Sequence, residues 1–188
     1  MIKDKLKKAE IGTVIKQDIS ENLANTVYLS IGSNLGNKRK NIEKTKYILE
    51  QNLIKILKSS NIYETYSWPN KNHPKYYNIV IKIITILKPI ELFYTIKSIE
   101  KKLGRKKSRI NNPRICDIDI IDYKGLIYKL ETNNNKLLIP HPRLHNRNFV
   151  LFPLFEIEKN WKHPTKKTKI QHLIEKLDNF SLYSIKQI

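Results

Sequence analysis

The order in which strand-like and helix-like segments alternate between Thr26 and Tyr123 constrains the fold of this chain more than any other feature. Runs rich in β-branched residues predict strands, and apolar residues spaced three or four apart predict amphipathic helices. The order is strand, helix, strand, strand, helix, strand, over about 27–32, 38–56, 60–65, 76–87, 89–104 and 115–123. This is the β-α-β-β-α-β order of a ferredoxin-like fold. The sequence therefore predicts an α+β domain with an antiparallel sheet of four strands and both helices packed on one face.

Turn residues mark the ends of these elements. A turn at 33–37 can cap the first helix, Pro89 suits the first turn of the second helix, and Gly104 suits its end. Beyond Tyr123 we expect C-terminal additions, namely a hairpin over 123–128, a polar turn at 132–135 and one or two helices. Residues 1–25 lack such patterning, so we expect a flexible N-terminal extension followed by a single domain over 26–188.

The composition fits a cytoplasmic enzyme. Cys116 is the only cysteine among the 188 residues, so no intrachain disulfide can form. No apolar run is long enough to span a bilayer, and the lysine-rich start of the chain lacks the apolar segment of a secretory signal. We therefore expect a cytoplasmic protein with no membrane partner.

The formal net charge of +19 suggests nucleic-acid binding at first sight. The excess is almost entirely lysine, spread over the whole chain, so drift in composition explains it more simply than a selected partner. Arginine is rare and clustered, because five of the six arginines lie between 105 and 147. Arginine grips phosphate through two parallel bonds where lysine offers a point charge. The sequence thus predicts the phosphate-binding region within 105–147.

Asp117-Ile118-Asp119 lies inside this arginine-rich region. Residues two apart on a strand face the same way, and two adjacent carboxylates repel each other unless a cation lies between them. Mg²⁺ commonly takes one or two carboxylates together with substrate phosphates. A chance pair on an exposed strand is the simpler explanation for the motif alone, but Arg114 three positions earlier favours a metal–nucleotide site.

Two other segments are weaker candidates for ligand contacts. Gly32-Ser33-Asn34-Leu35-Gly36 resembles a glycine-rich phosphate loop but lacks the ending of a Walker loop, so a tight strand-to-helix turn is the simpler interpretation. Pro140-His141-Pro142-Arg143, followed by Arg147, combines cations with a rigid backbone. A single loop histidine, however, more often bonds to backbone than to a ligand.

Taken together, these segments resemble the 6-hydroxymethyl-7,8-dihydropterin pyrophosphokinase family of the folate pathway over about residues 26–160. The specific blocks are Arg114-x-x-Asp117-x-Asp119 and Pro140-His141-Pro142-Arg143, in that order. Shorter matches accompany them at Ile31–Gly36, Tyr63-Glu64-Thr65, Tyr76-Tyr77-Asn78, Ile99-Glu100, Leu103-Gly104-Arg105 and Asn146–Leu151. The family also shares the ferredoxin-like order.

The resemblance implies a reaction. The β,γ-diphosphate of ATP would be transferred to the hydroxymethyl group of 6-hydroxymethyl-7,8-dihydropterin, and AMP would be released. Two Mg²⁺ ions, bound by Asp117 and Asp119 together with ATP, would stabilise the charge on the phosphates. We expect ATP and the pterin as small-molecule ligands of a monomer, with no nucleic-acid partner and no second folate-pathway enzyme fused to it.

The resemblance also implies the site residues. Catalytic roles would fall to Arg105, Arg114, Asp117 and Asp119. ATP would be bound by Glu100, Lys107, Arg114, Ile120, His141 and Arg147. The pterin would be bound by Thr65, Tyr76, Asn78, Asp117 and Phe149, with Phe149 stacked on the ring and Asn78 paired with its amide-like edge. Three departures from the family pattern affect the loops: Asn111 in place of a common tryptophan, Pro142 in place of tyrosine, and Tyr66-Ser67 in place of a proline pair.

Three alternatives remain open at this point. An RNA-recognition domain has the same element order, but it needs aromatic residues on its central strands where this chain has two carboxylates. An inactive family member is disfavoured by the joint presence of Asp117, Asp119, Arg114 and His141. A different metal-dependent nucleotidyl or phosphoryl transferase on the same fold would be distinguished by substrate profiling.

Overall fold

The computed structural model of the chain describes residues 24–105, 111–131 and 136–188. The predicted N-terminal extension lies outside these residues up to residue 23, and so do Lys107 and the predicted polar turn at 132–135.

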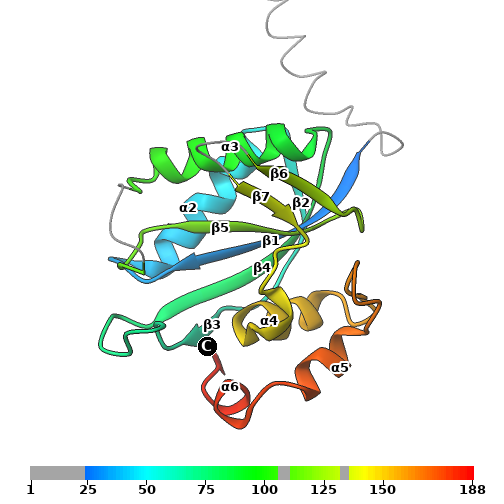
Figure 1. Cartoon of the computed structure of the whole chain (residues 1–188). Coiled ribbons are helices and arrows are strands. Elements are labelled where there is room, and N and C mark those ends of the chain that lie inside the picture. Colours follow the sequence, from blue (N-terminus) through cyan, green and yellow to red (C-terminus); the bar gives the residue numbers. More distant parts are fainter. Residues whose placement is uncertain (1–23, 106–110, 132–135) are drawn as a thin grey trace, which may run out of the picture.

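An antiparallel sheet forms the centre of the domain (Figure 1). Strand β1 (Asn25–Ser33) lies in the middle, with β5 (Asp117–Tyr123) on one side and β4 (Tyr76–Thr85) on the other. Both β2 (Ile54–Ser59) and β3 (Tyr63–Thr65) pair with the far edge of β4, and β8 (Lys186–Gln187) pairs with β3. The predicted ferredoxin-like α+β fold is therefore confirmed, although the sheet contains six strands where four were predicted.

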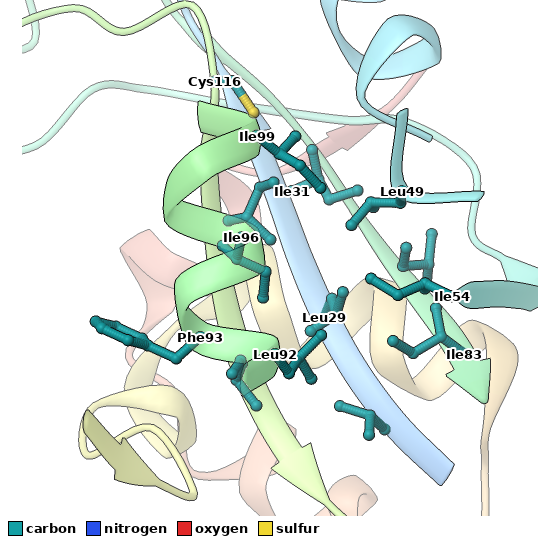
Figure 2. Close-up of a cluster of buried hydrophobic side chains, with 14 of the residues drawn as sticks. Leu29, Ile31, Leu49, Ile54, Ile83, Leu92, Phe93, Ile96, Ile99 and Cys116 are labelled. Carbon is teal, nitrogen blue, oxygen red and sulfur yellow. The ribbon is translucent and has the colours of Figure 1, made fainter. Parts of the chain in front are cut away.

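Helices α2 (Lys38–Glu50) and α3 (Pro89–Lys102) cover one face of this sheet (Figure 1). Figure 2 shows side chains of α3, among them Leu92, Ile96 and Ile99, directed toward Leu29 and Ile31 of β1. All five side chains are at most 1% exposed. Burying an aliphatic side chain of this size contributes about 1.5–3 kcal/mol, so this layer supplies much of the driving force for folding.

The opposite face of the sheet carries a second core. Alternation along β1 directs Tyr28 away from the α2–α3 layer, and it packs with Ile121, Leu151 and Trp161. This face is covered by α4 (Asn148–Ile157) and α5 (Ile170–Glu175). The first half of β5 directs Asp117 and Asp119 to this second face, beside the N-terminus of α4.

Smaller elements complete the fold. Strands β6 (Tyr128–Glu131) and β7 (Lys136–Ile139) form a separate two-stranded sheet, followed by the 3₁₀ turn η1 (Leu144–Asn146). Helix α6 (Asn179–Tyr183) precedes β8 near the C-terminus. Within the described ranges, none of the helices combines the length and apolar character that crossing a bilayer requires.

The end of the first predicted helix is wrong. The helix ends at Glu50 rather than near 56, the chain reverses through Leu53 at φ 57, and Ile54 begins a strand. Apolar residues at 53, 54, 56 and 57 fit either periodicity. Pairing of Ile54 and Ile56 with β4 decides in favour of the strand, and Asn52 donates to the carbonyl of Ile48 at the helix end. Of the second predicted strand, 60–65, only Tyr63–Thr65 form a strand, β3, because β2 already ends at Ser59.

The predictions beyond β5 are right in kind but wrong in detail. The chain does turn at Gly125, with φ 70, but β6 pairs with β7 and not with β5, so no hairpin forms over 123–128. Three α-helices follow residue 140, where one or two were predicted.

Candidate functional site

A cavity of about 700 Å³ opens on the second face of the sheet, within the usual size range of ligand pockets. It brings together residues from β1, β3, β4, β5 and the start of α4, which are far apart in the sequence. Ten of the predicted site residues line it, namely Thr65, Tyr76, Asn78, Arg105, Arg114, Asp117, Asp119, His141, Arg147 and Phe149.

Strand β5 presents its two aspartates to this cavity. Asp117 and Asp119 are half-buried on the cavity side, while Ile118 and Ile120 are buried in the α2–α3 core. The partners across the ladder are small, because Gly32 pairs with Asp117 and Ser30 with Asp119. The small partners leave the carboxylates accessible to a ligand.

Three arginines converge on the two carboxylates. Arg105 Nη1 lies 2.8 Å from Asp117 Oδ1, and Arg114 Nη1 lies 3.0 Å from Asp117 Oδ2. Arg147 Nη1 lies 3.2 Å from Asp119 Oδ2. The guanidinium side chains are about three-quarters buried, so water screens these pairs less than it screens exposed ones. Such an array of cations can bind several phosphate oxygens at once.

The carboxylate of Glu100 fixes the position of the Arg105 guanidinium. The Glu100 side chain is almost fully buried, and it accepts hydrogen bonds from the Ile118 amide at 2.8 Å, from Lys97 at 3.0 Å and from Arg105. Burial lowers the pKa of Arg105, but the carboxylates of Asp117 and Glu100 outweigh it, so the net shift is upward. Arg105 is therefore a permanently charged group in a fixed position.

Two predicted ATP-site residues do not line the cavity. Glu100 lies beneath Arg105, so the structure gives it a supporting position. The Ile120 side chain packs in the core at 6% exposure, which limits any contact with ATP to its backbone. Lys107 lies outside the described residues.

His141 faces Asp119 across the cavity. Its Nδ1 accepts from the Arg143 amide at 3.1 Å, and its Nε2 lies 4.0 Å from Asp119 Oδ2. The accepted bond assigns the proton to Nε2 in the neutral ring. Burial lowers the pKa of His141, with the nearby charges of Arg147 and Arg143 adding to this and Asp119 opposing it. At neutral pH, His141 is thus a hydrogen-bond donor directed toward the Asp119 side of the cavity.

The other end of the cavity is suited to a flat, polar ring. Asn78 Nδ2 donates to Thr65 Oγ1 at 3.0 Å, which fixes the amide plane. A Cβ atom on Gly32 would lie 3.1 Å from Asn78 Oδ1, so the absence of a side chain there makes room for the amide. Phe149 is half-buried, with the Arg147 guanidinium 5.4 Å from its ring centre.

Asn34 supports the site through contacts that the sequence did not indicate. It is 1% exposed, its Oδ1 accepts from the Arg114 amide at 2.6 Å, and its Nδ2 donates to Ser67 Oγ at 3.1 Å and Pro74 O at 3.2 Å. The segment 32–36 is thus the predicted strand-to-helix turn, and Asn34 within it joins Arg114 to the loop 66–75. An asparagine in a turn usually bonds its own backbone, so no local signal marked this longer reach.

Asn111, one of the departures from the family pattern, lies on the cavity wall at φ 67. Asparagine tolerates this left-handed conformation better than a bulky residue does. The substitution therefore suits the backbone that this chain adopts before Arg114.

The carboxylate pair is suited to Mg²⁺ only in company with a ligand. Among the residues that the structure describes, no group of three His, Cys, Asp or Glu side chains could hold a metal ion by itself. Mg²⁺ usually binds through one or two carboxylates, with phosphates and water completing six positions. Asp117 and Asp119 match that donor set.

Comparisons with known proteins identify a family that this chain matches. Residues 28–159 match the family model described as 7,8-dihydro-6-hydroxymethylpterin-pyrophosphokinase. The 2-amino-4-hydroxy-6-hydroxymethyldihydropteridine pyrophosphokinase of Aquifex aeolicus is 44% identical over 140 residues, which cover 74% of this chain and 84% of that protein. The Bacillus subtilis protein of the same name is 34% identical over 134 residues, 71% of this chain and 78% of that protein.

Some relatives are much longer. The folic acid synthesis protein fol1 of Pneumocystis carinii is 40% identical over 151 residues, and the match covers 80% of this chain but 20% of that protein. Among solved structures, wild-type HPPK-DHPS of Plasmodium falciparum superimposes with a TM-score of 0.70 at 16% identity, over 93% of this chain and 50% of that one. At this identity the superposition supports the fold alone.

Proposed function

The chain belongs to the 7,8-dihydro-6-hydroxymethylpterin-pyrophosphokinase family, and from this premise we propose that it transfers the β,γ-diphosphate of ATP to 6-hydroxymethyl-7,8-dihydropterin. The products are the pterin diphosphate and AMP. The observation that carries the proposal is the meeting of Asp117 and Asp119 with three arginines in one cavity whose other end is suited to a flat ring.

The arginines bind and orient the triphosphate. In the free protein Arg105, Arg114 and Arg147 neutralise the carboxylates. On binding ATP, the guanidinium groups would exchange a carboxylate for phosphate oxygens, so no partly buried charge would be left without a partner. His141 donates from Nε2 to the same end of the nucleotide.

Asp117 and Asp119 would hold two Mg²⁺ ions together with the phosphates. Bound Mg²⁺ supplies charge neutralisation at the phosphates and lowers the pKa of a coordinated hydroxyl group. The buried Glu100–Arg105 pair and the Ile118 amide keep the start of β5 fixed beneath these ligands.

The pterin occupies the end of the cavity formed by Thr65, Tyr76, Asn78 and Phe149. The fixed Asn78 amide pairs with the amide-like edge of the ring, and Phe149 stacks on its face. Asp117 lines the same cavity as these four residues, which suits a double role toward metal and pterin. This arrangement brings the hydroxymethyl group toward the phosphates, and such positioning supplies a large part of catalysis in phosphoryl-type transfers.

We further propose that the protein acts as a cytoplasmic monomer.

Release of AMP from MgATP tests the proposed function. We expect AMP to form only when 6-hydroxymethyl-7,8-dihydropterin is present, since the pterin hydroxyl is the acceptor. AMP formation that does not depend on the pterin, or none with it, would contradict the proposal.

A further inference from the structure

The last eleven residues, 178–188, follow the region matched by the family model and return to the cavity. We call this segment the C-terminal strap; it contains α6 and β8. Figure 1 shows α6 and the C-terminus beside β3, at the end of the molecule away from α3. Four strap residues line the same cavity as Asp117, namely Asp178, Phe180, Ser181 and Ser184.

One end of the strap is joined to the strand that enters the pterin end of the cavity. Strand β8 pairs antiparallel with β3, with Tyr63 opposite Gln187 and Glu64 opposite Lys186. The Ile188 amide extends this pairing by donating to Ile62 O at 2.9 Å. Because β3 ends at Thr65, the strap braces the strand from which the loop 66–75 emerges.

The other end of the strap is joined to the start of α4. Asn148 Nδ2 donates to Ser181 O at 2.6 Å and to Ser184 Oγ at 3.3 Å. Asn148 lies between Arg147 and Phe149 in the chain. The strap therefore links the two sides of the cavity, β3 and the N-terminus of α4.

Between these two attachments, Phe180 of the strap contacts Lys71 of the loop 66–75. Lys71 Nζ lies 4.1 Å from the centre of the Phe180 ring, in the geometry of a cation–π contact. Phe180 is 54% exposed, so the core does not account for its position. Both residues line the cavity.

We propose that Phe180 is a positioning residue, which holds the loop 66–75 over the pterin end of the cavity through its contact with Lys71. The inference rests on the proposed function for the identity of the ligand. The loop starts next to Thr65 and ends next to Tyr76. The fraction of free protein in which this loop is ordered is therefore the fraction that is ready to bind the pterin ring. A smaller competent fraction raises the apparent dissociation constant in proportion.

Kinetics of four variants test this role. Phe180→Leu keeps an apolar side chain but removes the aromatic face, and we expect a rise of about two- to fivefold in the KM for the pterin, with kcat and the KM for ATP unchanged. Phe180→Tyr keeps the face and should behave as wild type. Lys71→Met should reproduce Phe180→Leu, and the double variant should be no worse than either single variant, because both remove one contact.

Tyr183→Leu is the matched control, since it makes the same kind of change on the same helix at a residue that is 85% exposed and absent from the cavity wall. It should leave both KM values unchanged. Equal effects of Phe180→Leu and Tyr183→Leu, an equal rise in both KM values, or additive effects in the double variant would each overturn the role of Phe180.

Hydrogen exchange of the protein without substrates provides a readout independent of activity. Amides within 66–75 should exchange faster in Phe180→Leu than in wild type or Tyr183→Leu. Unchanged exchange in Phe180→Leu would refute the inference even if the pterin reaction is confirmed. Conversely, faster exchange in a protein that releases no pterin-dependent AMP would uphold the contact while the proposed function fails.

Discussion

Asp117 and Asp119 differ in how the free protein holds them. Asp117 is bound from two sides by Arg105 and Arg114, whereas Asp119 pairs with Arg147 and faces the neutral His141. Ligand binding can therefore proceed by exchange of ion-pair partners at both residues. The cost of removing charges from water is already met in the folded protein, which favours preorganised phosphate binding.

Asp119→Ala separates the metal role from the structural role. We expect turnover to fall by about a hundredfold or more, since a metal ligand contributes several kcal/mol to transition-state stabilisation. The free energy of unfolding should change by only about 1 kcal/mol, because Asp119 is partly exposed and its pair with Arg147 opens onto the cavity. Steady-state AMP release and urea unfolding measure the two effects.

The control is Glu43→Ala, which removes an exposed carboxylate of α2 that pairs only with Lys46 among the described residues. It should have little effect on either quantity. Normal turnover in Asp119→Ala would refute the metal assignment.

Arg114→Lys tests whether the fork geometry matters as well as the charge. Lysine keeps the positive charge but cannot form two parallel bonds to phosphate. We expect kcat to fall about tenfold or more, the usual value of a charged hydrogen bond. Arg39→Lys, on the exposed side of α2, is the matched control and should behave as wild type. Equal rates for the two variants would contradict the phosphate role of Arg114.

At the scale of elements, β1 and β5 form the floor of the site. Small residues on β1 stand opposite the two aspartates on β5, and Gly32 also lies against Asn78 on β4. Because Gly32 has no side chain, the strands on either side of β1 can present Asp117 and Asn78 to the same cavity.

Gly32→Ala should damage the pterin end of the site. The added Cβ would lie 3.1 Å from Asn78 Oδ1, so the amide must move and its bond to Thr65 must stretch. We expect a loss of about 1–3 kcal/mol of stability from overpacking, together with a raised KM for the pterin. Thermal unfolding and steady-state kinetics provide the measurements.

Gly36→Ala separates the clash from backbone strain. Gly36 has φ 66 but nothing within 4 Å of an added Cβ. The Gly36→Ala variant should therefore lose about 1 kcal/mol of stability through backbone strain alone, and it should keep the wild-type KM for the pterin. A raised KM in Gly36→Ala but not in Gly32→Ala would contradict the role assigned to Gly32.

Element order and the β5 pair were predictable because they depend on local pattern. The Asp-x-Asp spacing on a strand predicted that both carboxylates point to the same face of the sheet. The clustering of the rare arginines predicted which cations lie close to these carboxylates. The end of α2 was not predictable, because Ile54 and Ile56 satisfy both periodicities and only pairing with β4 decides between them. The reach of Asn34 to Arg114 is likewise a tertiary contact without a local signature.

At the scale of the whole molecule, the residues after α4 tie the second face of the sheet together. Trp161 Nε1 donates to the buried Asp122 at 2.8 Å, and Asp122 lies next to the bulge that shifts the β1–β5 register. His163 lies close by at 3% exposure, and its Nδ1 accepts from the amides of Thr165 and Lys166. The sequence showed helices in this region but not these contacts.

Acid should destabilise the protein through His163. Burial lowers the pKa of His163 to about 4, against about 6.5 in an unfolded chain. Folding therefore favours the neutral ring, so its contribution is complete above about pH 6.5 and is lost as the pH falls toward 4. The lowered pKa of the neighbouring His145 adds in the same direction. We expect a loss of about 2–3 kcal/mol from His163 between neutral pH and pH 4.

Urea unfolding at pH 7 and pH 4.5 measures this loss. In His163→Asn, a neutral side chain can accept the same bonds, so the dependence on pH should be markedly flatter than in wild type. His172→Asn changes an exposed histidine and should keep the wild-type dependence. The same slope in His163→Asn and in His172→Asn would show that His163 is not the group responsible.

The most direct test of the central claim is the identity of the transferred group, measured by ³¹P NMR of a completed reaction with MgATP and 6-hydroxymethyl-7,8-dihydropterin. The proposed function predicts AMP and a pterin diphosphate in equal amounts, without ADP. Formation of ADP with a pterin monophosphate, or hydrolysis of ATP that leaves the pterin unchanged, would contradict it.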